Sequence, residues 1–148
     1  MYNVIVVGTD GSETAGVAVH NATVLAKLTD ATLHVVHAHQ PLSMSHAATA
    51  GVTVDVVSIN EGIADSSVEV CDHAAEEAKR TGVRVETHAR PGDPADALIH
   101  VAEEVGADLL VIGNRRMTGV SRFVLGSVPN KVSHHAPCSL LIVDTSSG

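Results

Sequence analysis

Five short runs of β-branched and aliphatic residues recur along the chain, and segments with helical spacing of apolar residues separate them. Runs of this length and composition are typical of strands that are buried on both faces. Strands that alternate with helices predict a parallel sheet with right-handed crossovers and helices on both of its faces. The predicted strands are residues 4–9, 32–38, 83–89, 109–113 and 139–143. We therefore expect an α/β fold built on a five-stranded, mostly parallel sheet.

The apolar residues are unusual in kind, because the chain has 24 valines but one Phe, one Tyr and no Trp. Small and β-branched side chains suit a core in which helices lie close against a sheet. The length of 148 residues predicts a single domain over residues 1–148.

The charge balance argues against several classes of function. Nine Lys and Arg residues against 17 Asp and Glu residues give a net charge of −8, whereas binders of nucleic acid or anionic membranes need a basic surface. No apolar run approaches the roughly 18 residues of a membrane span. The first residues, MYNVIVVGTDGS, are typical of a strand and turn rather than a signal peptide, and Cys71 and Cys138 are isolated thiols. We expect a cytoplasmic protein with no nucleic-acid or membrane partner.

Helix start signals follow several of the predicted strands. Ser12 is predicted to cap the first helix. Asp93 is predicted to cap a later helix, with Pro94 at its first position. Ser127 is predicted to cap a short helix that ends near His134.

The middle of the chain has a weaker pattern. Residues 40–60 are polar and small, and we predict a long, flexible connection there. The helix that follows is predicted to bury Ser67 or Val68 together with Cys71. The strand at 83–89 alternates apolar and polar residues, which predicts a place nearer a sheet edge.

One loop is cationic in this acidic chain. Residues 113–131 contain four basic residues and no acidic residue, a local charge of +4. The basic residues are Arg115, Arg116, Arg122 and Lys131. The loop follows a predicted buried strand, and its Gly126-Ser127 pair opens a helix whose free N–H groups favour phosphate. These features predict an anion site, while a solvated surface is the alternative reading of the same charges.

The residues described so far resemble the universal stress protein family. The resemblance covers nearly the whole chain and is strongest in five segments: VIVVGTDGSETA, LHVVHA, the Gly92-x-Pro94 helix entry, ADLLVIGNR and GSVPNKVSHHAPCSLLIV. It implies a Rossmann-like fold of the adenine nucleotide alpha hydrolase-like type. It also implies a small protein of the stress response or of signalling that binds ATP, with or without Mg²⁺.

The ATP-binding branch of that family has a Gly-x2-Gly-x9-Gly-Ser loop. In this chain Gly113 matches the first glycine, and nine residues precede Gly126-Ser127. The second glycine of the pattern is Arg116 here. A guanidinium can point outward and hold phosphates, so we expect Arg116 to modify the phosphate site rather than abolish it.

The resemblance also implies which residues would line the nucleotide site. Asp10 would lie near the ribose or adenine, with Gly8 and Thr9 on the same wall, and Ala38 would contact adenine. The sugar and phosphates would meet Ile112, Gly113, Gly126, Ser127 and Val128. From the charge of the loop itself, we expect Arg115 and Arg116 to supply positive charge there. A carboxylate such as Asp10 suits ribose hydroxyls, but an Asp-Gly turn residue that bonds its own backbone is the equal alternative.

Metal binding and catalysis have little support in the sequence. The ten histidines, including His37, His39, His134 and His135, show no zinc-motif spacing, so we expect no metal site. No P-loop lysine and no Gly-x-Ser-x-Gly motif is present. A phosphoacceptor receiver domain would need more acidic residues after the first and third strands than this chain has. We expect no catalytic residues and a protein that is not an enzyme, with any ATP hydrolysis slow and incidental.

Two alternatives to ATP binding remain open. One is a cyclic AMP-binding member of the same family, and the other is an interaction module that binds no nucleotide. We also expect a homodimer, because residues 140–143 form an unbroken apolar run that an exposed sheet edge would leave open to aggregation. Family members are similar in pairing this last strand with its copy.

Overall fold

The computed structural model describes residues 1–43, 55–114 and 125–146. Its sheet has five strands in the order β3-β2-β1-β4-β5, and every neighbouring pair is parallel. The strands are β1 (Val4–Gly8), β2 (Thr32–His39), β3 (Val85–Pro91), β4 (Leu109–Gly113) and β5 (Ser139–Val143). The predicted fold class is therefore confirmed. β3 lies at a sheet edge, as the alternating pattern of its sequence predicts.

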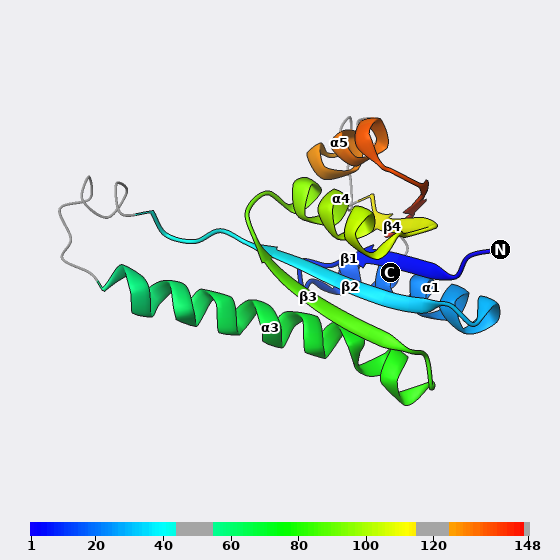
Figure 1. Ribbon diagram of the computed structural model, residues 1–148, viewed down its shortest axis with the longest axis horizontal. Helices are drawn as coiled ribbons and strands as arrows, with labels where there is room; N and C mark the ends of the chain where they lie inside the picture. The colour runs from blue at the N-terminus through cyan, green and yellow to red at the C-terminus, as the bar shows by residue number, and fades with distance from the viewer. Residues whose placement is uncertain (44–54, 115–124, 147–148) are drawn as a thin grey trace.

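Helices cover both faces of the sheet. They are α1 (Glu13–Thr29), α3 (Val56–Arg80), α4 (Pro94–Val105) and α5 (Ser127–His135). Figure 1 shows α4 and α5 on one side of the sheet and α3 on the other. Among the described residues, no helix is long and apolar enough to cross a membrane.

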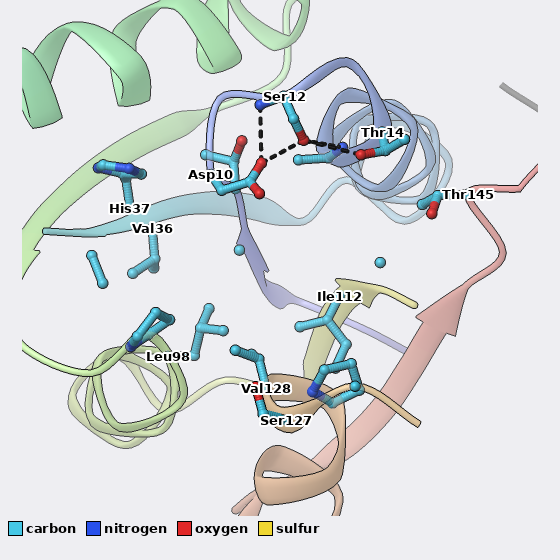
Figure 2. A pocket seen from close by; sticks show the side chains of 18 of the residues that line it. Asp10, Ser12, Thr14, Val36, His37, Leu98, Ile112, Ser127, Val128 and Thr145 are labelled. Carbon is cyan, nitrogen blue, oxygen red and sulfur yellow. Dashed lines mark hydrogen bonds between the residues drawn. The ribbon is translucent and has the colours of Figure 1, made fainter. Parts of the chain in front are cut away.

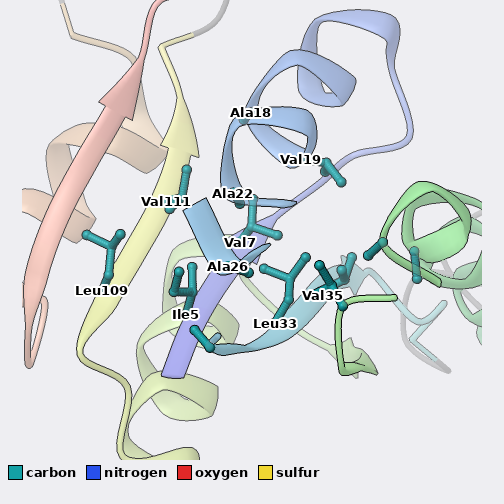
Figure 3. Close-up of a cluster of buried hydrophobic side chains, with 14 of the residues drawn as sticks. Ile5, Val7, Ala18, Val19, Ala22, Ala26, Leu33, Val35, Leu109 and Val111 are labelled. Carbon is teal, nitrogen blue, oxygen red and sulfur yellow. The ribbon is translucent and has the colours of Figure 1, made fainter. Parts of the chain in front are cut away.

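The core consists of two apolar layers, one on each face of the sheet. On the α1 and α3 face, strand residues such as Ile5, Val7 and Leu33 pack against alanines of α1, namely Ala18, Ala22 and Ala26 (Figure 3). The alanines are small, so α1 lies close against the strands. On the opposite face, four strand residues pack against α4 and α5: Val6, Val36, Leu110 and Ile112. Aliphatic residues fill both layers, as the composition predicts.

Two of the three predicted helix caps are confirmed. The Ser12 hydroxyl accepts a hydrogen bond from Ala15 N at 3.1 Å, and the Asp93 carboxylate accepts one from Asp96 N at 3.0 Å. The prediction for Ser127 is wrong. Gly126 is the N-cap of α5, and Ser127 is the first helical residue, so no side chain caps this helix.

The prediction of a flexible connection over residues 40–60 is wrong for its last residues, which belong to α3 and its cap. Asp55 caps α3 by accepting a hydrogen bond from Ser58 N at 3.1 Å, so the helix begins at Val56. Residues 44–54 lie outside the described part of the chain. On α3, Ser67 is buried and Val68 is exposed, because the helix turns its small residues toward the sheet.

Candidate functional site

A cavity of about 530 Å³ lies at the carboxyl ends of β1, β2 and β4. The strand order reverses between β1 and β4, and this switch point is where open α/β sheets bind ligands. The cavity volume is within the usual range for small-molecule sites. Figure 2 shows side chains from the loop after β1, from β2, β4, α4 and α5 arranged around it. The topology and the first helical turns thus build one concave site.

Nine of the predicted site residues line this single cavity. They are Gly8, Thr9, Asp10, Ala38, Ile112, Gly113, Gly126, Ser127 and Val128. The other two, Arg115 and Arg116, lie outside the described residues. The strand ends and the start of α5 come together as the sequence predicts, although residues 8 and 128 are far apart along the chain.

Two glycines of the cavity wall lie in close contact with packed side chains. A Cβ at Gly113 would lie 2.9 Å from Thr145 Cγ2, and a Cβ at Gly8 would lie 3.0 Å from two methyl carbons of Leu98. Thr145 is 2% exposed, and its N–H and Oγ1 both donate to Asn114 Oδ1 at 3.0 Å. Side chains at either glycine would therefore push against packed neighbours and narrow the cavity.

Asp10 has a clear structural role in the loop before α1. Its Oδ1 accepts hydrogen bonds from Ser12 N at 2.9 Å and from Ser12 Oγ at 2.5 Å, as the dashed lines in Figure 2 mark. Asp10 therefore acts as a turn residue that bonds its own loop, as the alternative prediction states. The carboxylate also lines the cavity, so contact with a ligand stays a prediction alongside the structural role.

His37 lines the same cavity and is one of the residues that the sequence analysis did not place there. Its Nδ1 lies 2.6 Å from Ser67 Oγ. Burial lowers the pKa of His37, and nearby His39 lowers it further, while the Asp10 carboxylate opposes both. A lowered pKa leaves the ring neutral at pH 7, when it presents one donor and one acceptor nitrogen.

Three helix N-termini open onto the cavity. At α1 and α4 a side chain already caps the first turn, from Ser12 and Asp93 respectively. At α5 the N-cap is Gly126, which has no side chain to offer, and Pro129 in the first turn has no N–H. The amides of Ser127 and Val128 have no intrahelical acceptor, because they belong to the first turn. The start of α5 is therefore the best place in the cavity for an anion.

Lys131 does not contribute its charge to this anion site as the +4 loop suggests. Its Nζ lies 2.9 Å from Asp96 Oδ1 and 3.3 Å from Asp93 Oδ2. Hydrogen bonds to Asp96 and Asp93 raise the pKa of the ammonium. Lys131 therefore ties α5 to the first turn of α4. The remaining cations of that loop, Arg115, Arg116 and Arg122, lie outside the described residues.

Several apolar and small residues of the wall were not predicted from the sequence. They include Val36, Leu98, Pro129 and Thr145. The place of Val36 in the wall could have been predicted, because this residue lies near the carboxyl end of a predicted strand at the switch point. The place of Thr145 could not have been predicted, because Thr145 follows the last strand and reaches the cavity through the packing of β5 beside β4.

Comparisons with known proteins place this architecture in a family. The model of the universal stress protein family matches residues 1–144. The universal stress protein Rv1636 of Mycobacterium tuberculosis is 38% identical over 145 residues, which are 97% of this chain and 97% of the relative.

Two solved structures of similar proteins contain adenine nucleotides. A universal stress protein in complex with cAMP is 32% identical, with a TM-score of 0.73 and 98% of each chain covered. The universal stress protein from Archaeoglobus fulgidus in complex with dAMP is 27% identical, with a TM-score of 0.65, over 95% of this chain and 97% of the other. The fold, the family match and these identities together show that the chain belongs to the universal stress protein family.

Proposed function

We propose that this chain binds an adenine nucleotide in the cavity, as a regulatory ligand in stress response or signalling, with ATP as the leading candidate. The observation that carries the proposal is the start of α5, which opens onto the cavity without a side-chain cap. A helix start of this kind favours a phosphate. The complexes of relatives with cAMP and dAMP support an adenine nucleotide as the ligand class.

The chemistry of the walls supports one orientation of the ligand. One wall of the cavity is apolar and would pack against an adenine ring; it is formed by Val36, Ala38 and Leu98. Asp10 offers a carboxylate to ribose hydroxyls. At the other end the amides of Ser127 and Val128 receive the phosphates, and Arg115 and Arg116 add positive charge.

Cyclic AMP is the second candidate ligand. The relative whose structure contains cAMP supports it, and so does Arg116, because a single compact phosphate needs less room than three. ATP, with or without Mg²⁺, is favoured by the intact spacing from Gly113 to Gly126-Ser127. An interaction module without any nucleotide is the remaining alternative.

We propose a binding protein rather than an enzyme. Among the described residues, the charged side chains that line the cavity are Asp10 and Asp93. Both already hold a loop or a helix start in place through hydrogen bonds. No described lysine or arginine lines the cavity to neutralise a transferring phosphoryl group, so hydrolysis would be slow.

We also propose a cytoplasmic homodimer that pairs through β5. This strand is at the sheet edge, has no charged residue, and leaves Leu141 36% exposed. An apolar edge without Pro or charge is prone to aggregate unless it is covered. Light scattering at micromolar concentration should give twice the chain mass, and Leu141→Lys should shift it toward the monomer. A monomeric wild type would contradict the dimer.

The ligand is tested by two linked experiments. Mass spectrometry of the ligand released from the purified, denatured protein should identify an adenine nucleotide. Calorimetry with ATP, ADP, AMP and cyclic AMP, on wild type and on Arg116→Gly, should then show binding in both, with a changed preference in the variant. A wild type that binds none of them would favour the interaction module, above all if the glycine variant binds ATP.

A further inference from the structure

A second group of titratable side chains lies on strands β2 and β3, outside the lining of the cavity. His34 stands opposite Glu86 in the register of the two strands, and His88 is two residues further along β3. Alternate residues of a strand point to the same face, so Glu86 and His88 share the face of His34. Figure 1 shows β2 and β3 side by side, with β3 at the edge of the sheet.

The ligand atoms of the three residues converge. His34 Nδ1 lies 2.9 Å from His88 Nε2 and 3.7 Å from Glu86 Oε2, and all three ligand atoms lie within 4.8 Å of one another. In a tetrahedral zinc site, bonds of roughly 2.0–2.1 Å place two nitrogens about 3.3 Å apart. The two imidazole rings therefore need to move apart only slightly, from a separation of 2.9 Å between the two nitrogens, to bind a cation between them.

We propose that His34, Glu86 and His88 form a site for one divalent cation of the zinc class. Two imidazoles and one carboxylate are the donor set that zinc and its neighbours in the transition series prefer. The side chain of Glu86 is 66% exposed, which leaves a solvent path and room for water as a fourth ligand. Two hydrogen-bonded strands hold the ligands, so the backbone fixes most of the geometry.

The protonation state suits a metal. Burial lowers the pKa of His34 and of His88, so both rings are neutral at pH 7. Without a metal, one ring donates a hydrogen bond to the other across the 2.9 Å. Metal binding needs both facing nitrogens as acceptors, so the donating ring moves its proton to its other nitrogen, with no net release.

Arg90 opposes the site. Its Nη2 lies 3.5 Å from His88 Nδ1, the nitrogen that must bear a proton when His88 Nε2 binds the metal. Glu104 holds the guanidinium there with contacts of 2.7 and 3.1 Å. Removal of Arg90 is therefore expected to tighten metal binding, which is the opposite of what removal of a ligand does.

The test uses the full chain after treatment with EDTA, titrated with zinc chloride in a calorimeter. Wild type should bind one zinc per chain, and His88→Gln should lose at least about tenfold in affinity. Arg90→Gln should bind more tightly than wild type. His20→Gln is the matched control, because exposed His20 also lies beside a glutamate, with its Nδ1 2.7 Å from Glu77 Oε1, but belongs to no such three-residue group in the described part of the chain.

A thermal melt gives an independent readout. Zinc should raise the melting temperature of wild type, because the cation joins edge strand β3 to β2, and it should not do so for His88→Gln. Since His34 is 6% exposed and its variants are more prone to misfold, the exposed Glu86→Gln serves as the second ligand variant and should also weaken binding.

Absence of saturable zinc binding in wild type would overturn the proposal and leave a hydrogen-bonded histidine pair. Equal losses in His88→Gln and His20→Gln would overturn it too, because they would indicate scattered binding to surface histidines. Neither result depends on whether the cavity binds a nucleotide.

Discussion

The starts of α4 and α5 face the same cavity but are completed in different ways. At α4, the Asp93 carboxylate accepts a hydrogen bond from Asp96 N, and Lys131 lies 3.3 Å from the same carboxylate. At α5, Gly126 occupies the cap position and offers no side chain. The start of α4 is therefore already occupied by a carboxylate of the protein, that of Asp93.

We expect an anionic ligand to bind at the α5 end of the cavity. A second negative charge beside Asp93 would be repelled, whereas the amides of Ser127 and Val128 would gain an acceptor. Lys131 adds to the contrast, because the two carboxylates that it pairs with, Asp93 and Asp96, belong to the start of α4. The orientation proposed for the nucleotide follows directly from this asymmetry.

The largest expected effect comes from making the two helix starts alike. Gly126 has φ of −60°, which any residue adopts, so Gly126→Asp can place a carboxylate at the cap of α5. The new carboxylate would take the amides and repel the phosphates, with a loss of about 3 kcal/mol in binding, or roughly 100-fold in affinity. Calorimetry with ATP measures it.

Gly126→Asn is the control for that experiment. Asparagine caps a helix about as well as aspartate but has no charge, so its loss of affinity should be clearly smaller. An affinity in Gly126→Asp equal to that of wild type would mean that the phosphates bind elsewhere.

Asp10 is expected to contact the ribose, away from the phosphates. Asp10→Ala removes an acceptor for the ribose and should cost about 1.5–3 kcal/mol, tenfold or more in affinity. Asp10→Asn keeps an oxygen for Ser12 while it removes the charge. If both variants bind ATP like wild type while the melting temperature of Asp10→Ala falls, Asp10 is a turn residue alone.

The fold could be predicted from the sequence because each strand and most helix starts are local patterns. VIVVG and LLVIG indicate buried strands, and Ser12 and Asp93 are good caps wherever they occur. The cap of α5 was predicted one residue late, because a serine after a glycine has the same local signal whether it caps the helix or begins it.

The site could be predicted only where a strand end or a glycine pattern indicates it. Thr145 and Leu98 reach the cavity through packing, as the close approaches to Gly113 and Gly8 show. The group of His34, Glu86 and His88 has no motif spacing, because the pairing of β2 with β3 brings its members together. No pattern along the chain could have revealed such contacts.

The cap of α4 is expected to have a smaller effect, on the free energy of unfolding. Asp93→Ala should lower the free energy of unfolding by about 1 kcal/mol, because α4 loses its cap. The hydrogen bond from Asp96 N holds the pKa of the Asp93 carboxyl below its ordinary value in the folded state. The contribution of Asp93 to stability is therefore complete above the ordinary pKa of an aspartate and is lost as the pH falls through the lower pKa of the folded state.

Chemical denaturation of wild type and Asp93→Ala from pH 7 to pH 2 checks this effect. The difference in stability should be constant near neutrality and should shrink in acid. A difference that persists at pH 2 would show that the carboxylate charge does not contribute to the cap.

In the proposed complex, an adenine nucleotide lies in the cavity with its phosphates at the start of α5. Amide chemical shifts in a two-dimensional NMR titration with ATP test this most directly, because they report both binding and its location. We expect the largest changes at Gly8, Ala38, Gly113 and Ser127, with little change at Leu141 on β5. Changes that cluster outside the cavity, or no changes at millimolar ATP and cyclic AMP, would contradict it.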